Sequence, residues 1–219
     1  MTPYRAIILD LDGTLVDSND AHARAWVQAL ADEGFHQSFE KVRPLMGMGG
    51  DQLVPRLTGV EPDTEQYTRL SDGWKDHFQR GELPTIRAQP GARELVKELR
   101  RRGLDLIIGT SGDGAVVEAL LMRADVADLV SQRTTASDVE DSKPAPDIVK
   151  AALKKLGRKA DEVLMLGDTP YDIESAGRSG VDTVALRCGG AEDGRLAGAI
   201  KVYNDPLDLL VHLDDLALG

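Results

Sequence analysis

The sequence predicts an α/β fold, in which a doubly wound, Rossmann-like parallel sheet forms the core and an all-α domain is inserted into it. Four short apolar runs are too short for helices, and each is followed by glycine or small polar residues, as expected of buried parallel strands. Segments with helical spacing alternate with these runs, which is typical of a parallel sheet covered on both faces. The stretch 16–86 has helical spacing without a strong strand signal, and we interpret it as the inserted helical domain.

The first predicted strand, 6–9, ends abruptly in Asp10-Leu11-Asp12-Gly13-Thr14. The other predicted strands have the same apolar character and cover 104–108, 162–166 and 183–186. Ligands bind at the carboxyl ends of the strands in open α/β sheets, so the residues that follow these strands are the first candidates for a functional site.

Three helices are predicted around the later strands. One begins at Pro90 and is stopped by Gly103, because proline is tolerated at a helix start and glycine favours a helix end. The others cover 147–156 and 172–179, and each is also followed by a glycine. We therefore expect a core domain of 1–15 and 87–219, with a helical cap domain of 16–86 connected near 15–17 and 84–89.

The composition excludes several classes of protein. The 219 residues carry a net charge of −11, which argues against a nucleic-acid partner and a basic membrane-surface protein. The single cysteine, Cys188, excludes an internal disulfide and a cysteine zinc site. No apolar run approaches a membrane span, and the N-terminal residues lack a signal-peptide pattern. We expect a soluble cytoplasmic protein, either a monomer or a homodimer, with no membrane partner.

Four carboxylates follow two of the predicted strands. Asp10 and Asp12 come after the first strand, and Asp168 and Asp172 come after 162–166. If the two strands lie close together, these acids would repel one another and raise each other's pKa. A hard divalent cation with oxygen ligands, Mg²⁺, is the natural compensation. Turn formation and helix capping are the alternative roles for these residues.

Two further segments suit a phosphate group. Thr110-Ser111-Gly112 follows the strand at 104–108 and offers a hydroxyl beside backbone N–H groups. Lys143 precedes Pro144, which restricts Lys143 to extended geometry and so limits where its ammonium can point. Taken alone, each segment is also compatible with an ordinary loop.

The order of these four motifs along the chain resembles the haloacid dehalogenase superfamily, in the group similar to phosphoglycolate phosphatases and β-phosphoglucomutases. The motifs are 10–16, 110–112, Lys143 and 167–172, and the resemblance spans essentially the whole chain. The segment Asp17-Ser18, with His22 and Trp26, extends it into the helical insertion. The resemblance implies a phosphatase with an α-helical cap and a small phosphorylated metabolite as its substrate.

The resemblance also implies a role for each matching residue. Asp10 would be the nucleophile that forms an aspartyl-phosphate, and Asp12 the general acid and base. The metal would be bound by the Asp10 and Asp168 side chains and the Asp12 backbone carbonyl, with Asp172 orienting the metal shell. The other expected substrate or phosphate contacts are Thr110, Lys143, Gly13, Ser111, Gly112, His22 and Arg43.

Asp12 favours cleavage of an O–P bond over a C–halogen bond, because a halide leaving group needs no proton. The charge balance of the site predicts a raised pKa for Asp12. A β-phosphoglucomutase-type mutase stays an alternative, but Gly167 stands before Asp168, where the mutase branch usually has an acidic residue. Cap cations that could serve a mutase or a specific phosphatase are Arg43, Lys75 and Arg87. A receiver-like switch or a non-catalytic phosphate-binding module is a more remote alternative.

The loop at 46–50 contains three glycines, Gly47, Gly49 and Gly50. It is either a specificity loop that meets the core domain or an ordinary turn between helices. His22 is either a proton partner of Asp12 or a hydrogen-bonded helix histidine.

Overall fold

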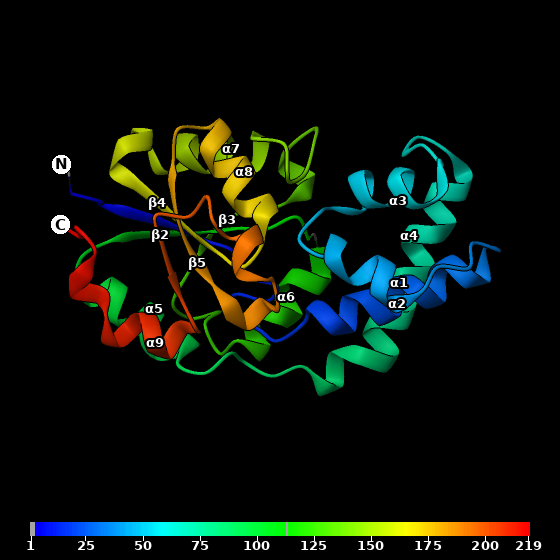
Figure 1. Ribbon diagram of the computed structural model, residues 1–219, viewed down its shortest axis with the longest axis horizontal. Coiled ribbons are helices and arrows are strands. Elements are labelled where there is room, and N and C mark those ends of the chain that lie inside the picture. The colour runs from blue at the N-terminus through cyan, green and yellow to red at the C-terminus, as the bar shows by residue number, and fades with distance from the viewer. Residues whose placement is uncertain (1–2, 113) are drawn as a thin grey trace.

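The computed structural model describes residues 3–112 and 114–219. Within these residues, a parallel sheet with strand order β3-β2-β1-β4-β5-β6 lies between helices on both faces (Figure 1). The strands are β1 Ala6–Leu9, β2 Asp105–Gly109, β3 Gln132–Thr134, β4 Val163–Gly167, β5 Asp182–Leu186 and β6 Lys201–Tyr203. The predicted α/β fold class is confirmed.

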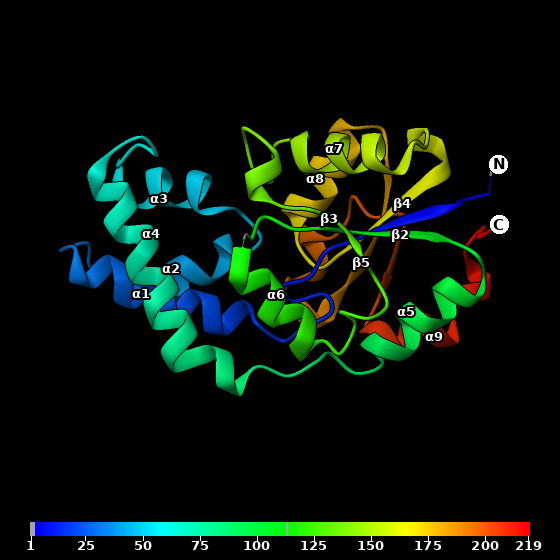
Figure 2. The same ribbon diagram turned by 180° about the vertical axis from the view of Figure 1, so that it is seen from behind.

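The two faces of the sheet are covered by different helices. Ala6 and Ile8 of β1 pack with α7 (Asp147–Leu156) and α8 (Pro170–Arg178) on one face. The intervening residues, Ile7 and Leu9, pack on the other face with α5 (Ala92–Arg101), α6 (Gly114–Arg123) and α9 (Pro206–Val211). Figure 2 shows the same layers from behind. Every second side chain of β1 thus faces the same helices, as the pleat of a strand requires.

The four predicted strands are confirmed to within one residue at each end. The apolar-run pattern misses β3 and β6, because these outer strands have three residues each and begin with the exposed polar residues Gln132 and Lys201. The helix expected to begin at Pro90 begins at Ala92 instead, since Gly91 adopts a left-handed conformation (φ 73°) directly before it. The helix expected at 172–179 begins earlier, at Pro170, where the side chain of Thr169 caps its first turn.

The inserted segment is helical, as predicted. It contains α1 (Asn19–Asp32), α2 (Phe39–Val42), α3 (Gly50–Thr58) and α4 (Glu65–His77), and it lies beyond one end of the sheet, on the right in Figure 1. Trp26, Leu30, Leu53 and Leu70 belong to a buried apolar cluster that the insertion forms for itself. A π-helical turn, Phe78–Glu82, follows α4, and Phe78 joins the main core.

The two chain segments that connect the insertion with the sheet lie side by side. Val16 pairs with Ala88 in an antiparallel bridge. The Asp17 N–H donates to the Arg87 carbonyl at 2.9 Å, and the Gln89 N–H donates to the Leu15 carbonyl at 2.9 Å. This pairing coincides with the connections expected near 15–17 and 84–89. The division into domains at 15/16 and 86/87 stays a prediction.

Both ends of the described chain lie at the opposite end of the sheet from the insertion (Figure 1). Tyr4 and Leu218 form a parallel bridge there, and the Tyr4 N–H donates to the Ala217 carbonyl at 2.8 Å. Among the described residues, no helix combines the length and the apolar character needed to cross a membrane.

Because Leu70 is fully buried in the cluster of the insertion, Leu70→Ala is expected to lower the free energy of unfolding by about 2–5 kcal/mol, measured by urea denaturation. Met122→Ala is the matched control: Met122 is 67% exposed, and its truncation should change stability by about 0.5 kcal/mol or less. Equal stabilities of the two variants would contradict the packing of the insertion.

Candidate active site

The candidate site lies where the order of strands reverses. β1 pairs with β2 on one side and with β4 on the other, so successive connections leave in opposite directions from this point. In doubly wound sheets, a crevice opens at the carboxyl ends of the strands at such a switch point. Asp10 follows β1 and Asp168 follows β4. The condition under which these carboxylates would meet, that the two strands lie close together, is therefore fulfilled.

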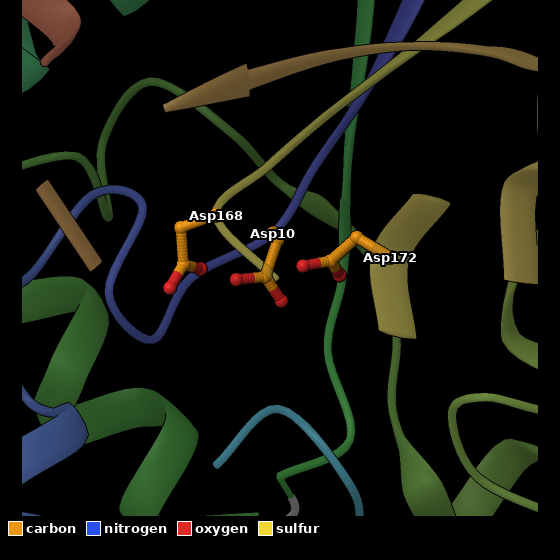
Figure 3. Close-up of side chains that lie close together, drawn as sticks. All are labelled: Asp10, Asp168 and Asp172. Atoms are coloured by element: carbon orange, nitrogen blue, oxygen red, sulfur yellow. The ribbon is translucent and has the colours of Figure 1, made fainter. Parts of the chain in front are cut away.

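Three carboxylates converge at this point. Asp10, Asp168 and Asp172 each offer an oxygen atom, and these atoms all lie within 4.8 Å of one another. Figure 3 shows Asp10 between the other two. Asp10 is 6% exposed, Asp168 is completely buried and Asp172 is 1% exposed. Burying this much like charge is unfavourable unless cations or hydrogen bonds compensate for it.

Lys143 supplies part of that compensation. Its ammonium Nζ lies 2.7 Å from Asp10 Oδ1, 2.7 Å from Asp172 Oδ1 and 2.7 Å from the Gly109 carbonyl oxygen. The side chain is 1% exposed. Burial would lower the pKa of Lys143, but the charges of Asp10 and Asp172 raise it above its usual value. Lys143 therefore stays charged in the buried site.

The cluster still lacks positive charge. Three carboxylates and one ammonium, −3 + 1, leave a formal charge of −2. Burial raises the pKa of Asp10 to about 7, since the lowering effect of Lys143 is smaller and Asp172 adds a further increase. Burial and the neighbouring charges of Asp10 and Asp172 raise the pKa of Asp168 well above its usual value. A divalent cation would balance this charge, and oxygen ligands suit a hard cation.

Two residues hold the carboxylates in place: Thr14, which lies in the first motif but for which the sequence predicts no role, and Asn19, which lies outside the four motifs. The buried Thr14 hydroxyl lies 3.0 Å from Asp10 Oδ2 and 2.9 Å from Asp168 Oδ1. Asn19 Nδ2 donates to Asp168 Oδ2 at 2.8 Å and to the Gly189 carbonyl at 3.1 Å. Asn19 Oδ1 is buried without a hydrogen-bond partner among the described residues. The site thus offers one more oxygen beside the three carboxylates, which fits an oxygen-liganded cation.

Asp12 is not one of these three carboxylates, and its hydrogen-bond partners are different. Its Oδ1 accepts the Ser18 hydroxyl at 2.5 Å and lies 2.7 Å from His22 Nε2. Burial would raise the pKa of Asp12, but the interactions with His22 and Ser18 outweigh it and lower the pKa below its usual value. The prediction of a raised pKa is therefore wrong for this structure, because these two partners, both close to the start of α1, favour the charged carboxylate.

A cavity of about 280 Å³ opens in front of Asp10 and Asp12. The sheet side is lined by Thr110, Ser111 and Gly112, and the cap side by residues of α1, the 46–50 loop and α4. Most of the expected contact residues therefore share one cavity. Lys143 reaches it indirectly, through its ion pair with Asp10. The proximity of His22 and Asp12 confirms that the two side chains are hydrogen-bonding partners.

These features match a known protein family. The family model described as haloacid dehalogenase-like hydrolase covers residues 7–186. The chain belongs to this family.

Its relatives support the same conclusion. Over 211 residues, the hydrolase is 31% identical to a phosphoglycolate phosphatase of Rhodospirillum rubrum, covering 92% of this chain and 87% of that protein. Its fold matches a hydrolase from Pseudomonas syringae with a TM-score of 0.89 and 36% identity, over 98% and 99% of the two chains. A putative β-phosphoglucomutase from Bacteroides vulgatus matches with a TM-score of 0.86 and 25% identity, over 99% and 91%. The prediction of an enzyme of the phosphatase class is confirmed.

Besides Lys143, two expected contact residues of the hydrolase, Arg43 and Gly13, do not line the cavity beside Asp10. The Arg43 guanidinium pairs with Asp20 and donates to the Gly189 carbonyl at 2.6 Å, so it lines a separate cavity near Arg195. Gly13 has a φ of 80°, and a Cβ atom there would overlap Asn19 and Asp168. The structure thus uses Gly13 to bring the turn close to the carboxylate cluster, and it uses Arg43 to connect the insertion with the loop after β5.

The glycine loop at 46–50 meets the sheet side of the hydrolase. The Ser111 hydroxyl donates to the Gly47 carbonyl at 3.3 Å. Gly47 has a φ of 100°, and a Cβ atom there would lie 2.8 Å from Thr169 side-chain atoms. Of the two interpretations of this loop, the structure favours the one in which it contacts the core.

Lys143→Met is expected to lower the free energy of unfolding by about 3–5 kcal/mol at pH 7, because it leaves buried carboxylates without their ammonium partner. Urea denaturation measures the change. Lys155→Met is the control, since Lys155 forms its ion pair with Asp138 at the surface, and its loss should change stability by about 1 kcal/mol or less. A Lys143→Met protein as stable as the control would contradict the charge balance described here.

Proposed function

We propose that the hydrolase is a Mg²⁺-dependent phosphohydrolase that cleaves a small phosphorylated metabolite through an aspartyl-phosphate on Asp10. The observation that carries this proposal is the position of Asp10. It is the one member of the carboxylate cluster that also lines the cavity. Its Oδ1 is paired with Lys143 and its Oδ2 with Thr14, so the carboxylate is held in a fixed orientation beside the space for substrate.

In the first step, an Asp10 oxygen attacks phosphorus while the bond from phosphorus to the leaving oxygen breaks. The leaving alcohol then needs a proton. We propose that Asp12 takes up a proton from water before this step and passes it to the leaving oxygen, while the hydrogen bonds with His22 and Ser18 hold the carboxyl group in place. In the second step, Asp12 accepts a proton from water as the water oxygen attacks phosphorus, and the Asp10 carboxylate is released with inorganic phosphate as the product.

The phosphoryl oxygens would be bound by Thr110, Ser111 and Lys143. Thr110 is fixed before substrate arrives, because its hydroxyl accepts the Gly112 N–H at 3.0 Å and its own N–H donates to the Thr134 carbonyl at 3.1 Å. Donors fixed in this way stabilise charge that develops in the transition state, typically by about 2.7–4 kcal/mol each.

The metal would be held by the Asp10 and Asp168 side chains and the Asp12 backbone carbonyl, with Asp172 orienting the shell. The charge of −2 on the cluster and the unpartnered oxygen of Asn19 support this assignment. When bound, the cation supplies positive charge that neutralises phosphoryl oxygens.

The cap side of the cavity indicates the class of leaving group. Tyr67, Ser71, Trp74 and Lys75 are all on α4, at a spacing that places them on one face of the helix. Lys75 is the only lysine or arginine among the described residues that line the cavity, and no ion pair involves it in the described chain. We propose that Lys75 binds a second acidic group of the substrate, as in phosphoglycolate, while a sugar phosphate stays the alternative class.

A phosphosugar mutase is the second candidate function, because the fold of this chain is similar to that of a putative β-phosphoglucomutase. A mutase must hold a second phosphoryl group of its bisphosphate. With Arg43 engaged elsewhere, Lys75 is the one cap cation among the described residues that line the cavity, which favours the phosphatase. A cytoplasmic location and a monomeric or homodimeric state stay predictions from composition.

The first test measures inorganic phosphate released from phosphoglycolate, hexose 1- and 6-phosphates and nucleoside monophosphates, with Mg²⁺ or with EDTA. We expect release that needs Mg²⁺ and is lost in Asp10→Asn, by on the order of 10⁶-fold in kcat if the loss matches that of nucleophiles in other hydrolases. Asp161→Asn is the control, because Asp161 is exposed near the start of β4, at the other end of the strand.

Phosphate release that persists in Asp10→Asn would contradict the aspartyl-phosphate. Conversion of a hexose 1-phosphate to its 6-phosphate after addition of a bisphosphate primer, without net phosphate release, would establish the mutase instead.

The second test compares phosphoglycolate with 2-hydroxyethyl phosphate, which has the same two-carbon chain but a neutral hydroxyl in place of the carboxylate. We expect Lys75→Met to lower kcat/KM for phosphoglycolate by about 10- to 100-fold, since a hydrogen bond to a charged group is lost. The value for 2-hydroxyethyl phosphate should change little. Lys41→Met is the control, because Lys41 is exposed on α2 outside the cavity. An equal loss for both substrates would contradict recognition of an acidic group by Lys75.

A further inference from the structure

Asp51, in the first turn of α3, spans the boundary between the insertion and the sheet. Its Oδ2 accepts the backbone N–H of Ser142 at 3.0 Å, and its Oδ1 accepts the Ser142 hydroxyl. Gln52 Nε2 donates to Asp51 Oδ2 at 3.0 Å. In the described part of the chain, no ion pair involves Asp51. Its carboxylate is therefore hydrogen-bonded to Gln52 within the insertion and to two donors of Ser142 across the boundary, and hydrogen bonds to a charged group are the stronger kind.

The backbone of the 46–50 loop is built for this close approach. A Cβ atom at Gly49 would overlap the Ser142 hydroxyl, so only glycine lets the loop lie against Ser142. The Ser111 hydroxyl donates to the Gly47 carbonyl from a second loop of the sheet side. The start of α3 and the loop before it thus contact two of the segments that contribute to the site.

Ser142 begins the short turn that carries Lys143. The Ala145 N–H donates to the Ser142 carbonyl at 2.9 Å, which closes the turn around Lys143 and Pro144. At its far end, the Ala145 carbonyl accepts the Ser175 hydroxyl of α8 at 2.7 Å. One end of the turn is therefore held by the core and the other by Asp51 of the insertion.

We propose that Asp51 is a positioning residue that couples contact of the cap loop to the placement of Lys143. Lys143 bonds Asp10 and Asp172 at 2.7 Å each, so a shift of its turn would move the ammonium relative to the nucleophile. While Asp51 holds Ser142, the insertion covers the cavity and the Lys143 turn is fixed at both ends. Release of Ser142 opens the cavity and frees one end of that turn. This inference rests on the proposed phosphohydrolase function.

The kinetic test compares Asp51→Ala, Asp51→Asn and Ser142→Ala, with Asp63→Ala as the matched control. Asp63 carries the same side chain, is exposed in the segment between α3 and α4, and does not line the cavity. We expect Asp51→Ala to lower kcat/KM for the best substrate by about 10- to 100-fold, the loss expected for hydrogen bonds to a charged group. Both a lower kcat and a higher KM should contribute, because both depend on the fraction of molecules in which the insertion covers the cavity. Asp51→Asn keeps the shape without the charge and should recover part of the loss.

A double-mutant cycle separates this coupling from two independent effects. Asp51→Ala combined with Ser142→Ala should be little worse than Asp51→Ala alone, because the hydroxyl bond that Ser142→Ala removes is one of the two bonds already lost in Asp51→Ala. If the fold-losses in kcat/KM of the two single variants multiply in the double variant, the two residues act independently and the proposal is overturned. Wild-type kcat/KM in Asp51→Ala would also overturn it, as would a lower Tm with unchanged kinetics, since that pattern indicates a structural role alone.

A fluorescence test does not depend on activity. The chain has two tryptophans, Trp26 and Trp74, and both line the covered cavity. We expect acrylamide to quench the tryptophan fluorescence of Asp51→Ala more strongly than that of wild-type protein or Asp63→Ala. Equal quenching would overturn the coupling. If wild-type protein releases no phosphate from any substrate, the proposed function fails, while the quenching comparison still decides whether Asp51 holds the cap loop.

Discussion

The burial of three carboxylates around one ammonium is the constraint on which the rest of this structure depends. Asp10, Asp168 and Asp172 lie at the carboxyl ends of two central strands, where water is largely excluded. Lys143 balances only part of their charge. The surrounding hydroxyl and amide groups of Thr14, Asn19 and Thr169 are committed to these carboxylates. A site with excess buried negative charge favours binding of a cation. The bound cation can in turn attract an anionic substrate, which is the physical basis for assigning phosphate chemistry here.

The capping of α8 illustrates how the fold and the site depend on each other. Asp172 Oδ2 accepts the Thr169 N–H at 3.0 Å and the Thr169 hydroxyl at 2.7 Å, while its Oδ1 accepts from Lys143. One carboxylate therefore completes a capping box and also contributes to the charged cluster. The two roles considered for Asp172, helix cap and site residue, are compatible because its two oxygens face different partners.

The insertion contributes what the sheet lacks. The sheet side offers carboxylates, hydroxyls and a buried ammonium, whereas α1 and α4 bring aromatic rings and a lysine to the same cavity. His22 stacks on Phe78 with ring centroids 4.1 Å apart while its Nε2 faces Asp12. This stacking fixes the imidazole plane, so a cap residue orients a partner of the proposed acid and base. The contact between Asp51 and Ser142 gives the cap a second connection to the site, on the side of Lys143.

The sequence by itself determined the central strands, the helical insertion and the residues of the four motifs, because apolar periodicity and local turn chemistry are encoded over a few neighbouring residues. It could not determine the edge strands β3 and β6, whose pairing depends on a partner strand rather than on their own three residues. Only the tertiary structure decided the partners of Asp12, the engagement of Arg43 with Gly189, and the contact between Asp51 and Ser142. These pairs are separated by 10, 146 and 91 positions along the chain, and each exists because packing of the insertion against the sheet brings together groups that no local pattern relates.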